Sequence, residues 1–207
     1  MYSYVMEFNL GRRGEETQEY LTDVARTWPE LWEQIPGVTG TLLLCSAFGL
    51  GGEFEFQWRV DFDKLSTLSR IGEAFRSSHD GWRHSRGEWF KHRRAVRAHL
   101  SGHRGGNKEY CHAHKGKEGA IHVIVASPYD EADRSARHLD EVAAVSGVIS
   151  VQALRPIVGS AASHEQIWLR LDGLDSLDNV AAVERGIEHG LVFGEMRELD
   201  GSLFTGA

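Results

Sequence analysis

The sequence predicts an α+β fold made of two tandem β-α-β-β-α-β repeats, and three observations carry that prediction. Strand-like and helix-like segments recur in the same order in both halves of the chain. The segment EFEFQWRVDF (53–62) alternates apolar and polar residues with the period of two that is typical of a half-buried strand. A Gly-Val pair precedes a strand-like run at matching places, with Gly37 in the first half and Gly147 in the second.

Composition and charge narrow the class of protein. The chain has 207 residues, of which 41% are hydrophobic and 26% charged, as in ordinary folded proteins. A net charge of −7 argues against a nucleic-acid-binding surface, which needs a basic face. The sequence has no apolar run of membrane-spanning length and no signal-peptide pattern, so we expect no membrane contact. The two cysteines are too few for a disulfide framework, and we therefore expect a cytoplasmic protein.

The first repeat is predicted over residues 1–100. A strand over 2–10 precedes a helix over 15–35, which has apolar residues at helical spacing and is expected to break at Pro29. Two strands follow, joined by a hairpin at Gly49, and the second of them is segment 53–62. A helix with leucine spacing then leads to a last strand over 93–101.

The second repeat is predicted over residues 120–207, after a polar, glycine-rich linker over 101–119. Its elements are a strand over 120–127, a helix over 130–147, a hairpin turning at Gly159, a short helix over 174–187 and a last strand over 191–199. The linker carries Cys111, His112 and His114, whose side chains suit zinc. Their spacing completes no four-ligand set, so a solvated linker is the favoured interpretation.

This order of elements, the ferredoxin-like arrangement twice over, resembles the dimeric α+β barrel superfamily. That superfamily includes antibiotic-biosynthesis monooxygenases, polyketide cyclases, muconolactone-isomerase-like proteins and several haem enzymes. The resemblance covers nearly the whole chain and rests on element order. It implies two sheets packed face to face as a barrel, helices outside and a ligand cavity between the sheets. It also implies that the protein needs either no cofactor or haem, and it leaves assembly into a homodimer open.

The polar side of segment 53–62 would face the barrel interior, because the sheet face that packs against the helices must be apolar. Aligning Asp61 with Asp172 makes Arg59 and Arg170 equivalent, as anchors for a carboxylate, phenolate or enolate or as internal ion pairs with those aspartates. Enclosed charges must pair, meet water or meet a polar ligand. The alternative is an open sheet with a solvated face. The predicted interior holds Glu7, Glu55, Gln57, Arg59, Arg97, His99, His122, Trp168 and Arg170.

Two histidines are predicted to be catalytic. A stripe from Leu68 to Trp82 continues through His79 at helical spacing and would turn it toward the sheet. His99 would be an inward imidazole whose pKa is lowered by neighbouring arginines, as suits a general base. The segment AFRSSHDGWRH resembles the Trp/Phe-and-His helix of the antibiotic-monooxygenase group, in whose haem-degrading members a histidine ligates iron. The resemblance implies His79, or His84 as second choice, as the ligand if haem is bound. A packed structural role is the alternative for each histidine.

The leading functional hypothesis is a small biosynthetic enzyme that oxygenates, cyclises or dehydrates an aromatic or polyketide-like metabolite. The alternatives are a haem enzyme with a histidine axial ligand and a non-catalytic small-molecule-binding protein that uses the same cavity. The residues expected to contact the substrate are Glu55, Gln57, Arg59, Trp82, Arg97, Trp168 and Arg170.

Overall fold

The computed structural model describes residues 1–11, 15–77, 79–106, 120–128, 136–159, 164–184 and 187–195. Its strands form a closed antiparallel barrel in the order β1-β3-β2-β8-β5-β7-β6-β4. The strands are β1 (Tyr2–Leu10), β2 (Val38–Ser46), β3 (Phe56–Phe62), β4 (Arg93–Gly106), β5 (Ile121–Pro128), β6 (Val148–Gly159), β7 (His164–Leu171) and β8 (Leu191–Glu195).

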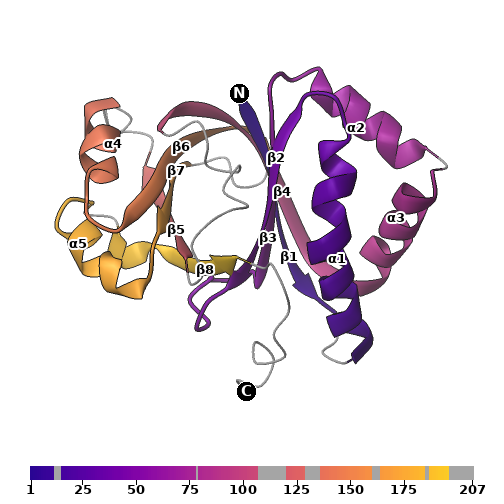
Figure 1. Ribbon diagram of the computed structural model, residues 1–207, viewed down its shortest axis with the longest axis horizontal. Coiled ribbons are helices and arrows are strands. Elements are labelled where there is room, and N and C mark those ends of the chain that lie inside the picture. Colours follow the sequence, from indigo (N-terminus) through magenta and orange to yellow (C-terminus); the bar gives the residue numbers. More distant parts are fainter. Residues whose placement is uncertain are drawn as a thin grey trace.

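Helices flank the barrel on two opposite sides (Figure 1). The first repeat contributes α1 (Glu15–Glu33), α2 (Thr67–Arg76) and α3 (Asp80–His92) to one side. The second contributes α4 (Ala136–Ala143), α5 (Leu177–Ala181) and the short 3-10 turns η3 (Leu174–Ser176) and η4 (Ile187–His189). None of the helices among the described residues is long and apolar enough to cross a membrane.

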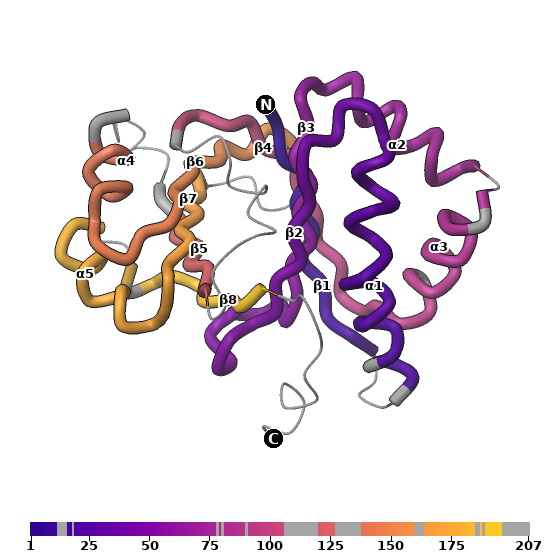
Figure 2. Tube along the Cα trace, viewed as in Figure 1, coloured from indigo at the N-terminus to yellow at the C-terminus, as the bar shows by residue number. Residues whose placement is uncertain are grey.

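One chain supplies both halves of the barrel, as the trace in Figure 2 makes plain. The halves meet at two seams, a long one between β4 and β6 and a short one between β2 and β8. The predicted α+β fold with two ferredoxin-like repeats closing as a barrel is therefore confirmed. Strand β4 continues to Gly106, into the segment that the sequence analysis assigned to the linker, because its residues from Ser101 onward pair with β6.

The alternation in 53–62 positions the core as predicted. Phe56, Trp58 and Val60 face the helices and join the hydrophobic core of the first repeat. The intervening side chains of Gln57 and Arg59 point into the barrel and are fully buried. A period-two pattern thus builds two different cores on the two faces of one sheet.

The duplication is visible in the backbone around the two Gly-Val turns. Gly37 and Gly147 both have positive φ, +99° and +89°, which favours glycine. In both repeats the glycine carbonyl accepts a hydrogen bond from an aspartate N–H, that of Asp63 at 3.0 Å and that of Asp172 at 2.9 Å. Asp63 and Asp172 are therefore equivalent, and the predicted alignment of Asp61 with Asp172 is wrong by two residues.

The strand registers give the same correction. Leu42 pairs with Arg59 in the first repeat, and Gln152 pairs with Trp168 at the matching place in the second. Arg59 is thus equivalent to Trp168. By the same registers Gly40 pairs with Asp61 and Ser150 pairs with Arg170, which makes Asp61 the equivalent of Arg170.

Two helical expectations are also wrong. Helix α1 runs unbroken through Pro29, and the Thr27 hydroxyl donates to the Asp23 carbonyl at 2.7 Å one turn earlier. The predicted single helix from Leu68 to Trp82 is instead two helices, because α2 ends at Arg76 with Ser77 in an extended conformation. His79 is the N-terminal cap residue of α3 and is exposed.

Some predicted segments lie outside the described residues. These are the linker region 107–119 with Cys111, His112 and His114, residues 130–135 of the predicted helix over 130–147, residues 185–186 of the predicted helix over 174–187, and residues 196–199 of the predicted last strand.

Candidate functional site

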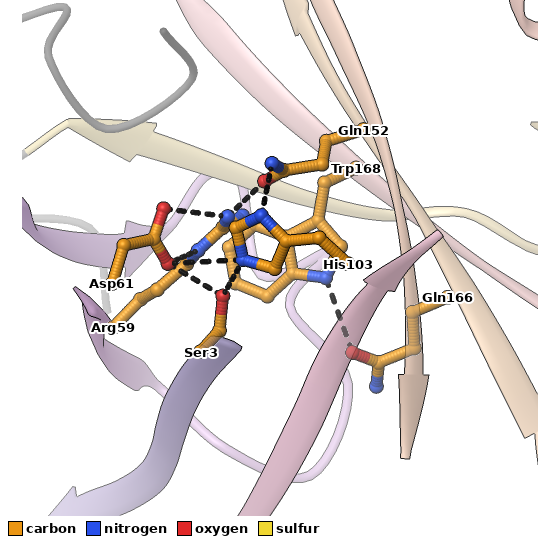
Figure 3. Close-up of polar contacts among 7 residues, drawn as sticks. All are labelled: Ser3, Arg59, Asp61, His103, Gln152, Gln166 and Trp168. Atoms are coloured by element: carbon orange, nitrogen blue, oxygen red, sulfur yellow. Dashed lines mark hydrogen bonds and ion pairs between the residues drawn. The ribbon is translucent and has the colours of Figure 1, made fainter. Parts of the chain in front are cut away.

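The barrel-facing sides of β1, β3, β4 and β6 carry a connected network of polar side chains (Figure 3). Arg59 donates two parallel hydrogen bonds to Asp61, Nε to Oδ1 and Nη2 to Oδ2, both at 2.9 Å. The Ser3 hydroxyl donates to Asp61 and lies 2.7 Å from Nε2 of His103. Gln152 closes the network from the second repeat, accepting from Arg59 and lying 2.8 Å from Nδ1 of His103.

The electrostatics of Asp61 follow from this network. Burial alone would raise the pKa of its carboxyl group, but the charge of Arg59 and the hydrogen bonds from His103 and Arg59 together hold it well below its usual range. Asp61 is therefore a permanent anion paired with a permanent cation. A carboxylate held in this way stabilises structure and is a poor proton acceptor.

Arg59 also stacks on Trp168, with its guanidinium carbon 4.7 Å from the ring centroid. These two residues occupy equivalent places in the two repeats, and their side chains lie against each other (Figure 3). The Trp168 indole N–H donates to Gln166 at 3.1 Å. Trp168 is inward, as predicted, and is packed against a protein cation.

A second polar cluster occupies the equivalent place in the other repeat. The strand registers relate Ser3 to His122 and Asp61 to Arg170. Nη2 of Arg170 lies 2.8 Å from Glu195, and Nε2 of His122 lies 2.7 Å from the same carboxylate oxygen. Burial lowers the pKa of His122, although Glu195 opposes the shift. Arg170 thus pairs with Glu195 and not with Asp172, which accepts from Ser176.

His99 lies on the inner face of β4, near a third ion pair, which Arg97 and Glu7 form. Arg97 binds Glu7 at 2.6 Å, and Gln57 donates to the same carboxylate at 3.3 Å. Burial is the main cause that lowers the pKa of His99, the expected effect of Arg97 and Arg59 adds to it, and Glu7 opposes the shift. Neither ring nitrogen of His99 has a well-formed hydrogen bond among the described residues, although Gln166 approaches closely enough to oppose the shift as well.

These contacts change the interpretation of the barrel interior. Arg59, Arg97 and Arg170 each face a carboxylate. The ion-pair alternative expected from the sequence thus names the observed partner of Arg59, which is Asp61, but not that of Arg170, which is Glu195. The side chains of Arg59, Trp168, Arg170 and Phe193 are almost completely buried. Glu55 lies half-buried just before β3. Among the described residues, the three interior arginines are thus each neutralised by a carboxylate.

A cavity of about 490 Å³ lies instead on the outer side of the sheet, between it and the helices of the first repeat. This volume falls within the range of small-molecule sites. Strands β1 and β4 form its floor and helices α1, α2 and α3 its walls. Its lining residues are Tyr4, Met6, Trp32, Leu68, Ile71, Gly72, Phe75, Trp89, Arg93 and Val96.

The chemistry of this helix–sheet cavity is aromatic, with few polar groups. Trp32, Phe75 and Trp89 offer ring surfaces, and Val96 is 52% exposed, so the cavity meets solvent there. Arg93 supplies the charge. Its Nε donates to the Trp89 carbonyl at 3.0 Å, and its Nη1 lies 3.1 Å from the Met6 sulfur. Such a site suits a flat apolar ligand that carries a polar group.

The predicted helical histidines do not reach either interior. His84 is 66% exposed at its side chain and lies 3.6 Å from Asp23, while His79 lines an open groove with Arg70 and Glu73. Trp82 packs between Trp32 and Phe75, at centroid distances of 5.7 and 5.0 Å, and belongs to the helical layer.

A haem group is not matched by these positions. Haem with a histidine axial ligand needs an apolar slot into which the imidazole is directed. The helix–sheet cavity is apolar, but no histidine or cysteine is among the residues that line it. The groove at His79 has the imidazole but charged walls. Among the described residues no group of three histidine, cysteine or carboxylate side chains could hold a metal ion either.

Sequence reasoning missed the helix–sheet cavity although its signals were present. Alternation along residues 2–10 puts Tyr4 and Met6 on the side of the strand opposite Glu7, and the first half of the chain is rich in tryptophan. The missing information was the width of the gap between helix and sheet. Arg93 was the available signal, since it is a charged residue at the junction of α3 and β4 beside this aromatic core.

Comparisons with known proteins agree on the fold. No protein-family model and no curated protein matches the chain. Among solved structures, a monooxygenase candidate from Fusobacterium nucleatum subsp. nucleatum has a TM-score of 0.61 at 8% identity, over 96% of this chain and 92% of that chain. An anthrone oxidase-like protein has a TM-score of 0.58 at 10% identity, over 94% and 91%.

A chlorite dismutase variant from Candidatus Nitrospira defluvii has a TM-score of 0.51 at 12% identity, over 94% of this chain and 90% of that chain. Identities this low establish the shared architecture alone. The chain has the fold of the dimeric α+β barrel superfamily, with both halves of the barrel in one polypeptide.

Proposed function

We propose that this protein is an oxidative enzyme that acts on an aromatic or polyketide-like metabolite bound in the helix–sheet cavity of the first repeat. The observation that carries the proposal is the cavity itself, about 490 Å³ in volume and lined by Trp32, Phe75 and Trp89. Offset stacking on such rings favours flat, conjugated ligands. The similar structures named as a monooxygenase candidate and an anthrone oxidase-like protein favour oxygenation over cyclisation or dehydration.

The reaction class is insertion of oxygen from dioxygen into an activated aromatic carbon. For an anthrone, the ring methylene becomes a carbonyl, one oxygen atom enters the product and the other leaves as water with the two hydrogens. The aromatic walls of the cavity would exclude bulk water from the reacting carbon.

The test is dioxygen consumption with anthrone, followed together with the absorbance of the anthraquinone product. We expect turnover by the wild type and its loss in Val96→Trp, which places a large ring at the exposed edge of the cavity. Val158→Trp is the matched control, because Val158 is 63% exposed on β6 and lies outside the cavity lining.

Two results would overturn the proposal in different ways. Equal activity in both tryptophan variants would place the reaction elsewhere in the molecule. Calorimetric binding of anthrone that Val96→Trp abolishes, with no dioxygen uptake by the wild type, would make the protein a non-catalytic binder.

A further inference from the structure

Arg93 is the one strongly charged group among the residues that line the helix–sheet cavity. It is half-buried and lies at the start of β4, directly after α3. The ring of Trp89 stacks against its guanidinium group. Its side-chain nitrogens donate to the Trp89 carbonyl and the Met6 thioether, both uncharged acceptors.

No carboxylate among the described residues forms an ion pair with Arg93, in contrast to the three arginines of the barrel interior. Burial lowers its pKa to about 9, with Tyr20 and Tyr4 opposing the shift, so the group is cationic at neutral pH but poorly solvated. A desolvated cation without a counter-ion is costly, and a bound anion would relieve that cost.

A second polar group of the same cavity lacks a partner. The indole N–H of Trp32 is buried and has no hydrogen-bond acceptor among the described residues. Buried N–H groups in folded proteins nearly always have an acceptor. The cavity therefore offers a cation and a free neutral donor, and no described carboxylate lines it.

We infer that the helix–sheet cavity binds its aromatic ligand as an oxyanion, a phenolate or enolate, with Arg93 as the counter-ion and the Trp32 indole N–H as a second donor. This inference rests on the proposed function for the location of the ligand, and it adds the ligand's charge state. It also replaces Arg59 and Arg170, whose carboxylate partners occupy them, as the anchor expected from the sequence.

The consequence for chemistry is that the protein itself makes the ligand more acidic. A nearby arginine lowers the pKa of an acidic group by one to three units or so. A phenol ionises near pH 10 in water, so beside Arg93 it would ionise at about pH 7–9, and its proton would leave to solvent. An ionised phenol or enol is also the electron-rich form that reacts with dioxygen.

The experiment uses 4-nitro-1-naphthol, whose absorbance reports ionisation, and its methyl ether, which cannot ionise. With the wild type, we expect the bound naphthol to ionise at a pH lower by about one unit or more than the free compound. By calorimetry at neutral pH, Arg93→Met should weaken naphtholate binding by about tenfold or more and methyl-ether binding by less than about twofold. Arg93→Lys should restore part of the naphtholate affinity.

The possible failures are distinguishable. If both compounds bind and the naphthol ionises at the same pH as in solution, the inference is wrong while the cavity remains the ligand site. If neither compound competes with anthrone, the proposed function fails first. The wild-type titration decides the ionisation question even if Arg93→Met does not fold.

Discussion

At the scale of single residues, Arg59, Arg97 and Arg170 of the barrel interior each lie against a carboxylate. The inward direction of Arg59, His99 and Trp168 follows from period-two alternation and needs no structure. Their partners do not follow, because partners depend on strand register across the barrel. A two-residue error in aligning the repeats was enough to pair Arg59 with the wrong equivalent.

The Arg59–Asp61 pair is expected to stabilise the fold strongly against removal of one partner. Asp61→Asn leaves a buried guanidinium without its carboxylate, which costs about 3–5 kcal/mol. Urea unfolding measures the change. Asp140→Asn, at an exposed position of α4, should alter the free energy of unfolding by less than about 0.5 kcal/mol. Equal effects of the two substitutions would mean that the ion pair contributes nothing.

His99 gives the stability of the protein a pH dependence. Burial lowers its pKa in the folded state, so below pH 6.5 or so the unfolded chain binds more protons and the free energy of unfolding falls as the pH decreases. Above that pH the effect is absent. His99→Gln should flatten the change between pH 7 and pH 5, measured by urea unfolding at each pH.

The control for that measurement is His79→Gln, because His79 is exposed at the start of α3. It should leave the pH dependence as in the wild type. His122 is buried with a pKa shifted in the same direction, so His99→Gln is expected to flatten the curve in part. An unchanged curve would show that His99 is solvated.

At the scale of elements, local sequence signals located the strands and turns well and the helix ends less well. The Gly-Val pairs marked real turns with positive φ. The sequence pattern does not predict the break at Ser77, because apolar residues continue at helical spacing on both sides of it. Pro29 had the opposite effect, since a proline in a helix removes one hydrogen bond and tertiary packing of Trp28 and Trp32 keeps α1 continuous.

The turn at Gly147 should not tolerate a side chain. A Cβ there would clash with the Ser176 hydroxyl, and φ is +89°. Gly147→Ala is therefore expected to lower the free energy of unfolding by about 2 kcal/mol or more. Gly194→Ala is the matched control, since among the described residues none beyond its chain neighbours comes within 4 Å of its would-be Cβ. Thermal unfolding of both variants makes the comparison, and equal melting temperatures would contradict the account.

At the scale of the whole molecule, the duplicated order of elements was sufficient to predict the fold. It was insufficient to predict the candidate site, which lies in only one of the two repeats. The barrel interior and the helix–sheet gap are lined by opposite faces of the same strands. The volume of each space depends on side-chain sizes and packing, which alternation along a strand does not give.

Closure of the barrel by contacts between the repeats should make unfolding a single transition. Arg59 of the first repeat contacts Gln152 and Trp168 of the second, and β4 pairs with β6 over a long seam. Tryptophan fluorescence reports mainly the first repeat and far-ultraviolet circular dichroism reports both. We expect the two probes to give the same urea midpoint. Separate midpoints would mean that the halves unfold independently.

The central claim is that the ligand site lies between helices and sheet of the first repeat. The most direct measurement is a crystal structure of the protein with bound 4-nitro-1-naphthol. The account predicts the ring between Trp32, Phe75 and Trp89, with its oxygen at Arg93. A ring found inside the barrel, displacing the Arg59–Asp61 network, would contradict it.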